Sequence, residues 1–194
     1  MRELLRKAWH FIWEDNSILS WVINIILAFV IIKFLVYPGL GFVLATTNPV
    51  VAVVSGSMEH DGSFDGWWID KGRFYEGINI TKADFETFQF ENGFSKGDLM
   101  ILRGRQPSEL SMGNIIVFRG KTRDPVIHRL VSIHRTGETY TFSTKGDNNN
   151  NQLSYEKQIP ENQIIGQAVV RIPFLGYVKI IFTETANLLL GRPA

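Results

Sequence analysis

Residues 18–36 read ILSWVINIILAFVIIKFLV, an apolar run of 19 residues in which Asn24 and Lys33 are the main interruptions. At about 1.5 Å of rise per residue, a helix of this length crosses a hydrocarbon layer of about 30 Å. Lys33 lies near the end of the run, where its long side chain can extend to the interface. A buried helix of a soluble core is the alternative, but such a helix has a more polar outer face. The run therefore predicts a transmembrane anchor over residues 18–37.

Basic residues on the two flanks of this run predict its orientation. Arg2, Arg6 and Lys7 precede it, whereas residues 34–70 contain neither arginine nor lysine.

 The N-terminal flank of the run is therefore its basic flank. Because lysine and arginine collect on the cytoplasmic side, we expect residues 1–17 in the cytoplasm and the rest of the chain on the outer face. A cleavable signal peptide is the alternative, but the run exceeds the usual apolar region of about 7 to 15 residues. We therefore expect an uncleaved, single-pass anchor.

The chain after the anchor has the composition of a β-domain, which we place at residues 38–178. Pro38, Gly39, Gly41 and Pro49 are expected to end the helix. Short segments rich in valine, isoleucine, threonine and aromatic residues follow, separated by Gly-rich turns, as is typical of an antiparallel sheet or small barrel. The candidate strands are Val50–Val54, Asp98–Leu102, Asn114–Phe118, Val126–His134, Thr139–Thr144 and Ile164–Arg171. The fold class is therefore mainly β.

Two further segments do not fit the strand pattern. Residues 60–95 form an aromatic-rich insertion, in which Thr81 can cap a short helix and Asp84 favours its positive end. The C-terminal segment, residues 179–194, contains Lys179 and is too short for a second membrane span. We expect it to be amphipathic and to lie on the lipid or to pack on the domain.

Composition excludes several function classes. With 20 Lys+Arg against 19 Asp+Glu, the formal charge is +1, so there is no basic excess to hold a nucleic acid. The chain has no cysteine, which rules out disulfides, thiolate nucleophiles and Cys-ligated zinc. It also lacks a P-loop, a G-x-G-x-x-G loop and clustered histidine ligands. We therefore expect neither a metal nor an organic cofactor.

The segment Ser55-Gly56-Ser57 follows the first candidate strand and can present a hydroxyl in a turn. A serine hydroxyl is inert near neutral pH unless a neighbouring base takes its proton. His10 is expected in the cytoplasm, and His60 lies in a loop where an exposed histidine needs no role. The remaining histidines, His128 and His134, share one strand.

The even spacing of these two histidines predicts that both lie on one face of the strand. Six residues at about 3.3 Å each place them about 20 Å apart, so at most one serves a given site. Asp147 follows Gly146 at another strand end, a pattern that by itself indicates an Asx-type turn.

Taken together, five segments occur in the order found in signal peptidase I. They are Ser55-Gly-Ser-Met58, Gly97-Asp-Leu99, Gly113-Asn-Ile-Ile-Val-Phe118, Val126-Ile-His-Arg129 and Lys145-Gly-Asp-Asn148. The chain resembles this family from the anchor to about Val178. The bacterial branch has lysine before the arginine of the fourth segment, whereas the archaeal and endoplasmic-reticulum branch has histidine, as here.

The resemblance implies roles for four residues. Ser57 would be the nucleophile and His128 the general base and later acid. Asp147 would orient His128 or compensate its charge, and Ser55 would be an oxyanion donor beside the Ser57 amide. An imidazole with a pKa near about 6.5 is largely neutral at pH 7 and can accept the serine proton.

The sequence departs from the family pattern at two places. His60 stands where the family often has proline. Many members of this branch also carry a second acid several residues after the Gly-Asp pair, but here Glu156 is the first acid reached. Either Asp147 alone supports His128, or Glu156 substitutes through a shifted loop. We expect Asp147 alone.

The resemblance implies a membrane-bound serine endopeptidase that removes signal peptides from secretory preproteins after small residues. Its expected partners are signal-peptide-bearing preproteins, the lipid membrane and the protein translocation channel, at a cell membrane or an endoplasmic reticulum membrane. Two alternatives remain: a catalytically inactive, membrane-tethered peptide-binding module, and a Ser/Lys self-cleaving protease that uses Lys145. Replacement of His128 separates the Ser/Lys protease from the Ser/His signal peptidase, because only the second needs His128 as its base.

Overall fold

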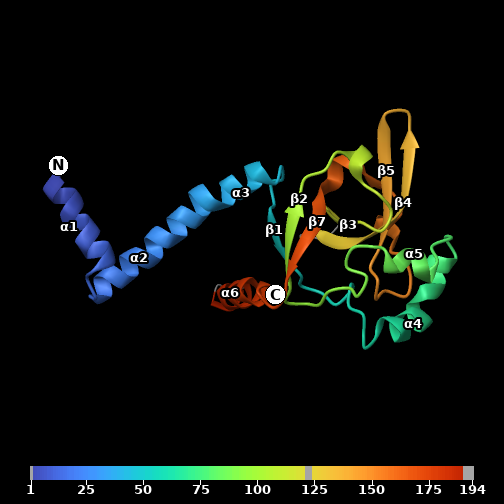
Figure 1. Cartoon of the computed structure of the whole chain (residues 1–194), viewed down its shortest axis with the longest axis horizontal. Helices are drawn as coiled ribbons and strands as arrows, with labels where there is room; N and C mark the ends of the chain where they lie inside the picture. Colours follow the sequence, from blue (N-terminus) through green and yellow to red (C-terminus); the bar gives the residue numbers. More distant parts are fainter. Residues whose placement is uncertain (1, 121–123, 190–194) are drawn as a thin grey trace. The chain divides into compact units, whose positions relative to one another are not determined.

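The computed structural model describes residues 2–120 and 124–189. It divides into two compact units, Met1–Val43 and Leu44–Ala194. The first unit is helical, with α1 at Arg2–Trp13, α2 at Ile18–Ile31, a π-helical turn η1 at Ile32–Val36 and α3 at Tyr37–Val43 (Figure 1). From α2 to α3 the helix is continuous over 26 residues and is long and apolar enough to cross a membrane.

Two polar side chains at the start of this long helix donate hydrogen bonds to α1. The Asn24 side chain donates to the Ile12 carbonyl at 2.8 Å, and the Ser20 hydroxyl donates to the Phe11 carbonyl at 2.6 Å. Ser17 caps α2 by accepting from the Ser20 amide. The bond from the Asn24 Nδ2 lowers the cost of placing an asparagine in the apolar run, although the buried Asn24 Oδ1 has no hydrogen-bond partner among residues 2–120 and 124–189.

The expectation that Pro38 ends the helix is wrong, since α3 continues through it to Val43. The π turn immediately before it gives the reason. In this π turn, Ile32–Val36, the amide of the following residue Tyr37 donates to the carbonyl of Ile32, five residues earlier. Such a widened turn accommodates the proline ring and the missing N–H, which a regular α-helix cannot do without a kink.

The second unit is built on one antiparallel sheet of seven strands, which confirms the mainly β prediction (Figure 1). Its order is β1-β2-β7-β3-β4-β5-β6. The strands are β1 Val50–Ala52, β2 Leu99–Arg103, β3 Ile115–Phe118, β4 Val126–Thr136, β5 Thr139–Lys145, β6 Ile159–Pro160 and β7 Ile164–Ile172. All six predicted strands are present. The unpredicted strand, β6, has only two residues and includes a proline, so it carries no alternating pattern.

A β-bulge in β4 corrects the expected placement of the two strand histidines. The register between β4 and β5 shifts between Leu130 and Ser132, and His134 then pairs with Thr141. One extra residue reverses the alternation of side chains along the rest of the strand. His128 and His134 therefore do not share a face, and His134 is exposed.

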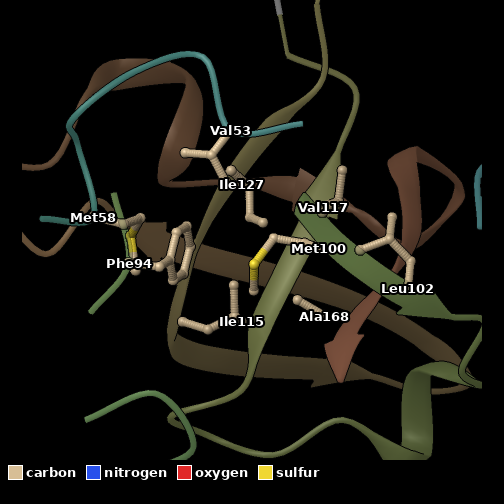
Figure 2. Packing of buried hydrophobic residues seen from close by; sticks show 9 residues of the cluster. All are labelled: Val53, Met58, Phe94, Met100, Leu102, Ile115, Val117, Ile127 and Ala168. Atoms are coloured by element: carbon tan, nitrogen blue, oxygen red, sulfur yellow. The ribbon is translucent and has the colours of Figure 1, made fainter. Parts of the chain in front are cut away.

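Apolar side chains cover both faces of the sheet. One cluster combines strand residues with Val53, Met58 and Phe94 (Figure 2). Its buried members are Val53, Met58, Phe94, Met100, Leu102, Ile115, Val117, Ile127 and Ala168. A second cluster is built around Ile116, Leu130 and Phe142. Since Ile115 and Ile116 are consecutive in β3, they belong to opposite faces, and so do the two clusters.

The insertion carries two helices, α4 at Phe64–Glu76 and α5 at Lys82–Glu86. The predicted start of α5 is confirmed, because Thr81 and Asp84 form a capping box. Helix α4 was not predicted, although Ser63 caps it and its aromatic residues Phe64, Trp67, Trp68 and Tyr75 follow a helical spacing. Its glycines lower the intrinsic helix propensity. It is stabilised by packing, with Trp67, Trp68 and Tyr75 buried against Phe85 of α5.

Three short 3₁₀ turns and a last helix complete the unit. The turns are η2 at Pro107–Glu109, η3 at Ser154–Glu156 and η4 at Glu161–Gln163, and the helix is α6 at Gly176–Leu189. Ile180 of α6 is buried, whereas Val178, Ile181 and Phe182 are exposed. Residues 190–194 of the predicted C-terminal segment lie outside the described residues.

Candidate active site

The nucleophile loop, residues 55–60, follows β1 and lies against the loop that follows β5. The Asn148 amide donates to the Ser57 carbonyl at 2.8 Å, and the Asn148 side chain donates to the Gly56 carbonyl at 3.1 Å. Gly146 permits this close approach, because a Cβ there would lie 2.9 Å from the Ser57 carbonyl oxygen and 2.8 Å from His128 Nε2. The two loops thus meet at the main chain of Gly56 and Ser57.

His128 reaches Ser57 from β4. Its Nε2 lies 2.9 Å from Ser57 Oγ, a hydrogen-bond distance. His128 is 4% exposed, whereas Ser57 is half-buried and so remains accessible to a peptide. The sequence-predicted nucleophile and base are therefore in contact, although 71 positions separate them in the chain.

The other ring nitrogen of His128 contacts Glu156, not Asp147. Glu156 lies in η3, and its Oε1 accepts from His128 Nδ1. Its Oε2 accepts from the Leu153 amide at 2.7 Å, which fixes the carboxylate. Because Nδ1 carries the hydrogen in this bond, Nε2 is free to accept the proton of Ser57. The arrangement has the polarity of a serine–histidine–acid triad.

This contact corrects the expected partner of His128. Asp147 follows β5 at a point where its carboxylate faces Arg129, the residue next to His128 in β4. Consecutive strand residues point to opposite faces, so an acid that meets Arg129 is not in place to meet His128. Glu156, which the sequence offered as the alternative, takes that place.

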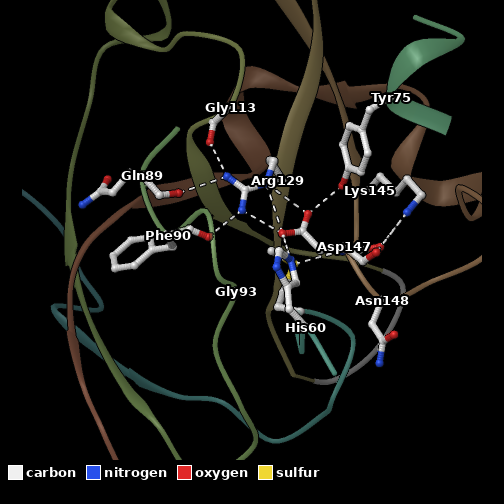
Figure 3. A network of polar contacts seen from close by, with 12 residues as sticks. His60, Tyr75, Gln89, Phe90, Gly93, Gly113, Arg129, Lys145, Asp147 and Asn148 are labelled. Atoms are coloured by element: carbon white, nitrogen blue, oxygen red, sulfur yellow. Dashed lines mark hydrogen bonds and ion pairs between the residues drawn. The ribbon is translucent and has the colours of Figure 1, made fainter. Parts of the chain in front are cut away.

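Asp147 is the centre of a separate buried network (Figure 3). Arg129 donates to both of its oxygens, from Nε at 3.0 and 3.1 Å and from the terminal nitrogen at 2.7 Å. The Tyr75 hydroxyl donates at 2.6 Å, and His60 Nε2 lies at 3.0 Å. Burial alone would raise the pKa of Asp147, but the Arg129 guanidinium and the His60 contact hold it well below its usual range.

Arg129 uses its remaining donors on main-chain carbonyls. It donates to Gln89 and Gly113 at 3.0 Å and to Phe90 at 2.9 Å. Its guanidinium also lies 4.5 Å from the centroid of the Phe85 ring. The arginine is fully buried and satisfied, which is the condition under which a buried ion pair is tolerated.

The buried Lys145 lies on the same face as Arg129, its cross-strand partner. Its Nζ donates to the carbonyls of Gly146 and Asp147 at 3.1 and 3.3 Å and lies 5.1 Å from the centroids of Phe74 and Tyr75. Burial lowers the pKa of Lys145 to about 8. These contacts direct the amine toward the insertion.

Ser55, the predicted oxyanion donor, lies on the nucleophile loop as expected from its sequence position. Its hydroxyl is 3.2 Å from Ser57 Oγ. Ser55 is exposed, so the hydroxyl is available to a bound peptide.

Sequence reasoning missed His60, whose side chain is 2% exposed and not solvated as expected. Its spacing from Ser57 gave no signal of burial. The aromatic residues of the insertion indicate that part of it is packed, because clustered tryptophans bury a large apolar area. Their pattern does not show that His60 is the residue against which they pack.

Curated proteins similar to this chain identify its family. No protein-family model matches the chain. The chain is 30% identical over 158 residues to the signal peptidase complex catalytic subunit SEC11 of Metarhizium acridum, an alignment of 78% of this chain and 73% of the relative. With the same coverage, it is 30% identical to the sec11 protein of Neurospora crassa and 32% identical to that of Sclerotinia sclerotiorum. The chain thus belongs to the SEC11 family of signal peptidase catalytic subunits.

Proposed function

We propose that this chain is a membrane-anchored serine endopeptidase that removes signal peptides from secretory preproteins, with Ser57 as nucleophile and His128 as general base. The observation that carries the proposal is the 2.9 Å contact between Ser57 Oγ and His128 Nε2 in a half-buried site. Membership of the SEC11 family supports the substrate class, since the relatives are named as signal peptidase catalytic subunits.

The proposed reaction begins when His128 Nε2 takes the proton of Ser57 as Oγ attacks the scissile carbonyl carbon. Glu156 then stabilises the imidazolium through Nδ1 and holds the ring in the correct tautomer. His128 returns the proton to the leaving amine. It then takes a proton from a water molecule, whose oxygen attacks the acyl carbon, and returns that proton to Ser57 Oγ as the ester bond breaks. Ser55 and the Ser57 amide would donate to the oxyanion, and loss of one such donor costs about 10²- to 10³-fold in rate.

The proposed setting is a membrane. The helix Ile18–Val43 would anchor the chain, with the N-terminus in the cytoplasm and the β-domain on the lumenal or outer face. Since the relatives are catalytic subunits of a complex, we place the chain among further membrane subunits, in an endoplasmic reticulum or related membrane. Preproteins would reach it from the translocation channel, with small side chains before the scissile bond.

Lys145 gives no support to the Ser/Lys alternative. Its Nζ donates to the carbonyls of Gly146 and Asp147 and lies over the rings of Phe74 and Tyr75. A lysine base would have to lie within hydrogen-bond reach of the serine that it activates.

The test is cleavage of a preprotein with an Ala-x-Ala site by the full chain in detergent. Ser57→Ala and His128→Ala should each reduce cleavage by at least about 10⁴-fold, because nucleophile and base act as one unit. His134→Ala, a change at an exposed histidine of the same strand, should cleave like the wild type. Activity that survives Ser57→Ala would refute the mechanism, and activity that survives only His128→Ala would favour a lysine base. A wild type that binds but never cleaves would support the inactive peptide-binding module.

A further inference from the structure

His60 has no part in the reaction proposed above, yet its side chain is buried three residues beyond Ser57. The ring stacks on Trp67 of α4, with 3.7 Å between ring centroids and 9° between planes. Gly93 leaves room for it, because a Cβ there would lie 2.7 Å from His60 Cδ2. A polar ring is costly to bury, so a specific interaction has to compensate.

That interaction is the hydrogen bond to Asp147 (Figure 3). His60 Nε2 lies 3.0 Å from Asp147 Oδ2. Because Arg129 keeps the carboxylate ionised, Asp147 can only accept, and His60 Nε2 must carry the hydrogen. Within residues 2–120 and 124–189, His60 Nδ1 has no hydrogen-bond partner. The ring is therefore held by one hydrogen bond, by stacking on Trp67 and by a tilted contact with Phe85.

The same two loops are joined at three other points. Asn148 donates to the carbonyls of Ser57 and Gly56, and the Asp147 amide donates to Met58 Sδ at 3.4 Å. These contacts hold residues 56–58, on either side of the nucleophile. The His60–Asp147 bond fastens the far end of the nucleophile loop to the same acceptor loop.

We propose that His60 is a positioning residue, which fixes the nucleophile loop so that Ser57 Oγ stays within reach of His128 Nε2. The inference rests on the proposed function for its rate effect. It also gives the insertion a role, since Trp67 packs on the ring and Tyr75 donates to the same carboxylate. A displacement of about 1 Å at a reacting group can cost about 10²-fold in rate, so a loop anchor of this kind affects catalysis.

The first arm of the test compares kcat and KM, per folded enzyme, for His60→Gln and His60→Leu. Glutamine can place an N–H donor near the position of histidine Nε2, whereas leucine fills a similar volume without one. We expect His60→Leu to lower kcat at least tenfold with KM within about twofold, and His60→Gln to stay within about threefold of the wild type. His134→Leu is the matched control. An unchanged kcat for His60→Leu, or equal losses for both variants, would overturn the proposal.

The second arm needs no cleavage and so separates this inference from the proposed function. Amide hydrogen exchange is compared between Ser57→Ala and Ser57→Ala/His60→Leu in the full chain. We expect faster exchange in residues 55–60 and 146–149, with strands β3 and β7 unchanged. A uniform rise over the domain would mean that His60 only adds global stability, which contradicts a positioning role. If the wild type cleaves no preprotein, the proposed function fails, while the exchange result still decides whether His60 fixes the loop.

Discussion

Two consecutive residues of β4, His128 and Arg129, each contact a buried carboxylate on opposite faces of the sheet. His128 contacts Glu156 of η3, whereas Arg129 contacts Asp147 after β5. The nearer acid in the sequence belongs to the arginine and the farther one to the histidine. Pairing thus follows the alternation of side chains along the strand, and not the distance along the chain.

The two pairs differ in what their chemistry permits. The histidine pair reaches the half-buried Ser57, and an imidazole can gain and lose a proton near neutral pH. The arginine pair is fully buried, and a guanidinium stays protonated, so it can hold geometry but cannot carry a proton. We therefore expect the first pair to control the rate directly, and the second to control stability and to affect the rate only through the His60–Asp147 bond.

Among changes to the two acids and to Arg129, the largest expected effect is that of Glu156→Gln on rate. A neutral amide cannot stabilise the imidazolium of His128, so kcat should fall by about 10³- to 10⁴-fold. The melting temperature should change little, because glutamine has almost the same volume and keeps one acceptor. Steady-state cleavage and a melting curve on the same preparation measure both effects.

Asp147→Asn is the matched change in the other network. It should affect the melting temperature more than Glu156→Gln does, because Arg129 loses its countercharge. If Glu156→Gln retained kcat while Asp147→Asn at unchanged stability lost it, Asp147 would be the acid that serves His128, and the division between the two pairs would be refuted.

The next effect is that of Arg129→Met on stability. The change leaves Asp147 buried without a countercharge, which costs about 3 to 5 kcal/mol. For a domain of this size the melting temperature should fall by roughly 6 to 20 °C. The double change Arg129→Met/Asp147→Asn should be milder than Arg129→Met alone, because the uncompensated charge is gone. A double variant with a lower melting temperature than Arg129→Met would show that Arg129 does not stabilise the domain by compensating the charge of Asp147.

Much of this fold could be predicted from sequence because its patterns are local. The anchor and six strands follow from runs of apolar and β-branched residues, and the start of α5 follows from Thr81 and Asp84. Helix α4 was missed although Ser63 and the spacing of its aromatic residues are local signals, because its glycines lower helix propensity and its stability comes from aromatic residues that meet only after folding. Strand β6 also could not be predicted, because it has only two residues and is defined by its pairing with β5.

The site divides in the same way. The contact between Ser57 and His128 could be predicted, because a serine nucleophile needs a base and the resemblance to signal peptidase I assigned that role to His128. The choice between Asp147 and Glu156 could not, because it depends on which face of β4 each acid reaches. The burial of His60 likewise depends on Trp67 and Asp147, which lie 7 and 87 positions away in the chain. Contacts of this kind leave no trace in spacing.

The smallest expected effect is a pH dependence that Lys145 adds to the face of Arg129. Burial lowers the pKa of Lys145 to about 8, whereas an unfolded lysine stays protonated to about 10.5. Between these values the unfolded chain binds more protons, so the free energy of unfolding rises with pH, by about 2 kcal/mol from pH 7.5 to 9.5.

Burial and Asp147 raise the pKa of Tyr75, and ordinary tyrosines titrate near 10, so tyrosine ionisation lies above this range. Melting of the full chain in detergent should therefore rise by a few degrees in the wild type and in Lys96→Met, a change at an exposed lysine, but stay flat in Lys145→Met. A rise that persists in Lys145→Met would mean that another group titrates, and that Lys145, like Arg129, keeps its charge throughout.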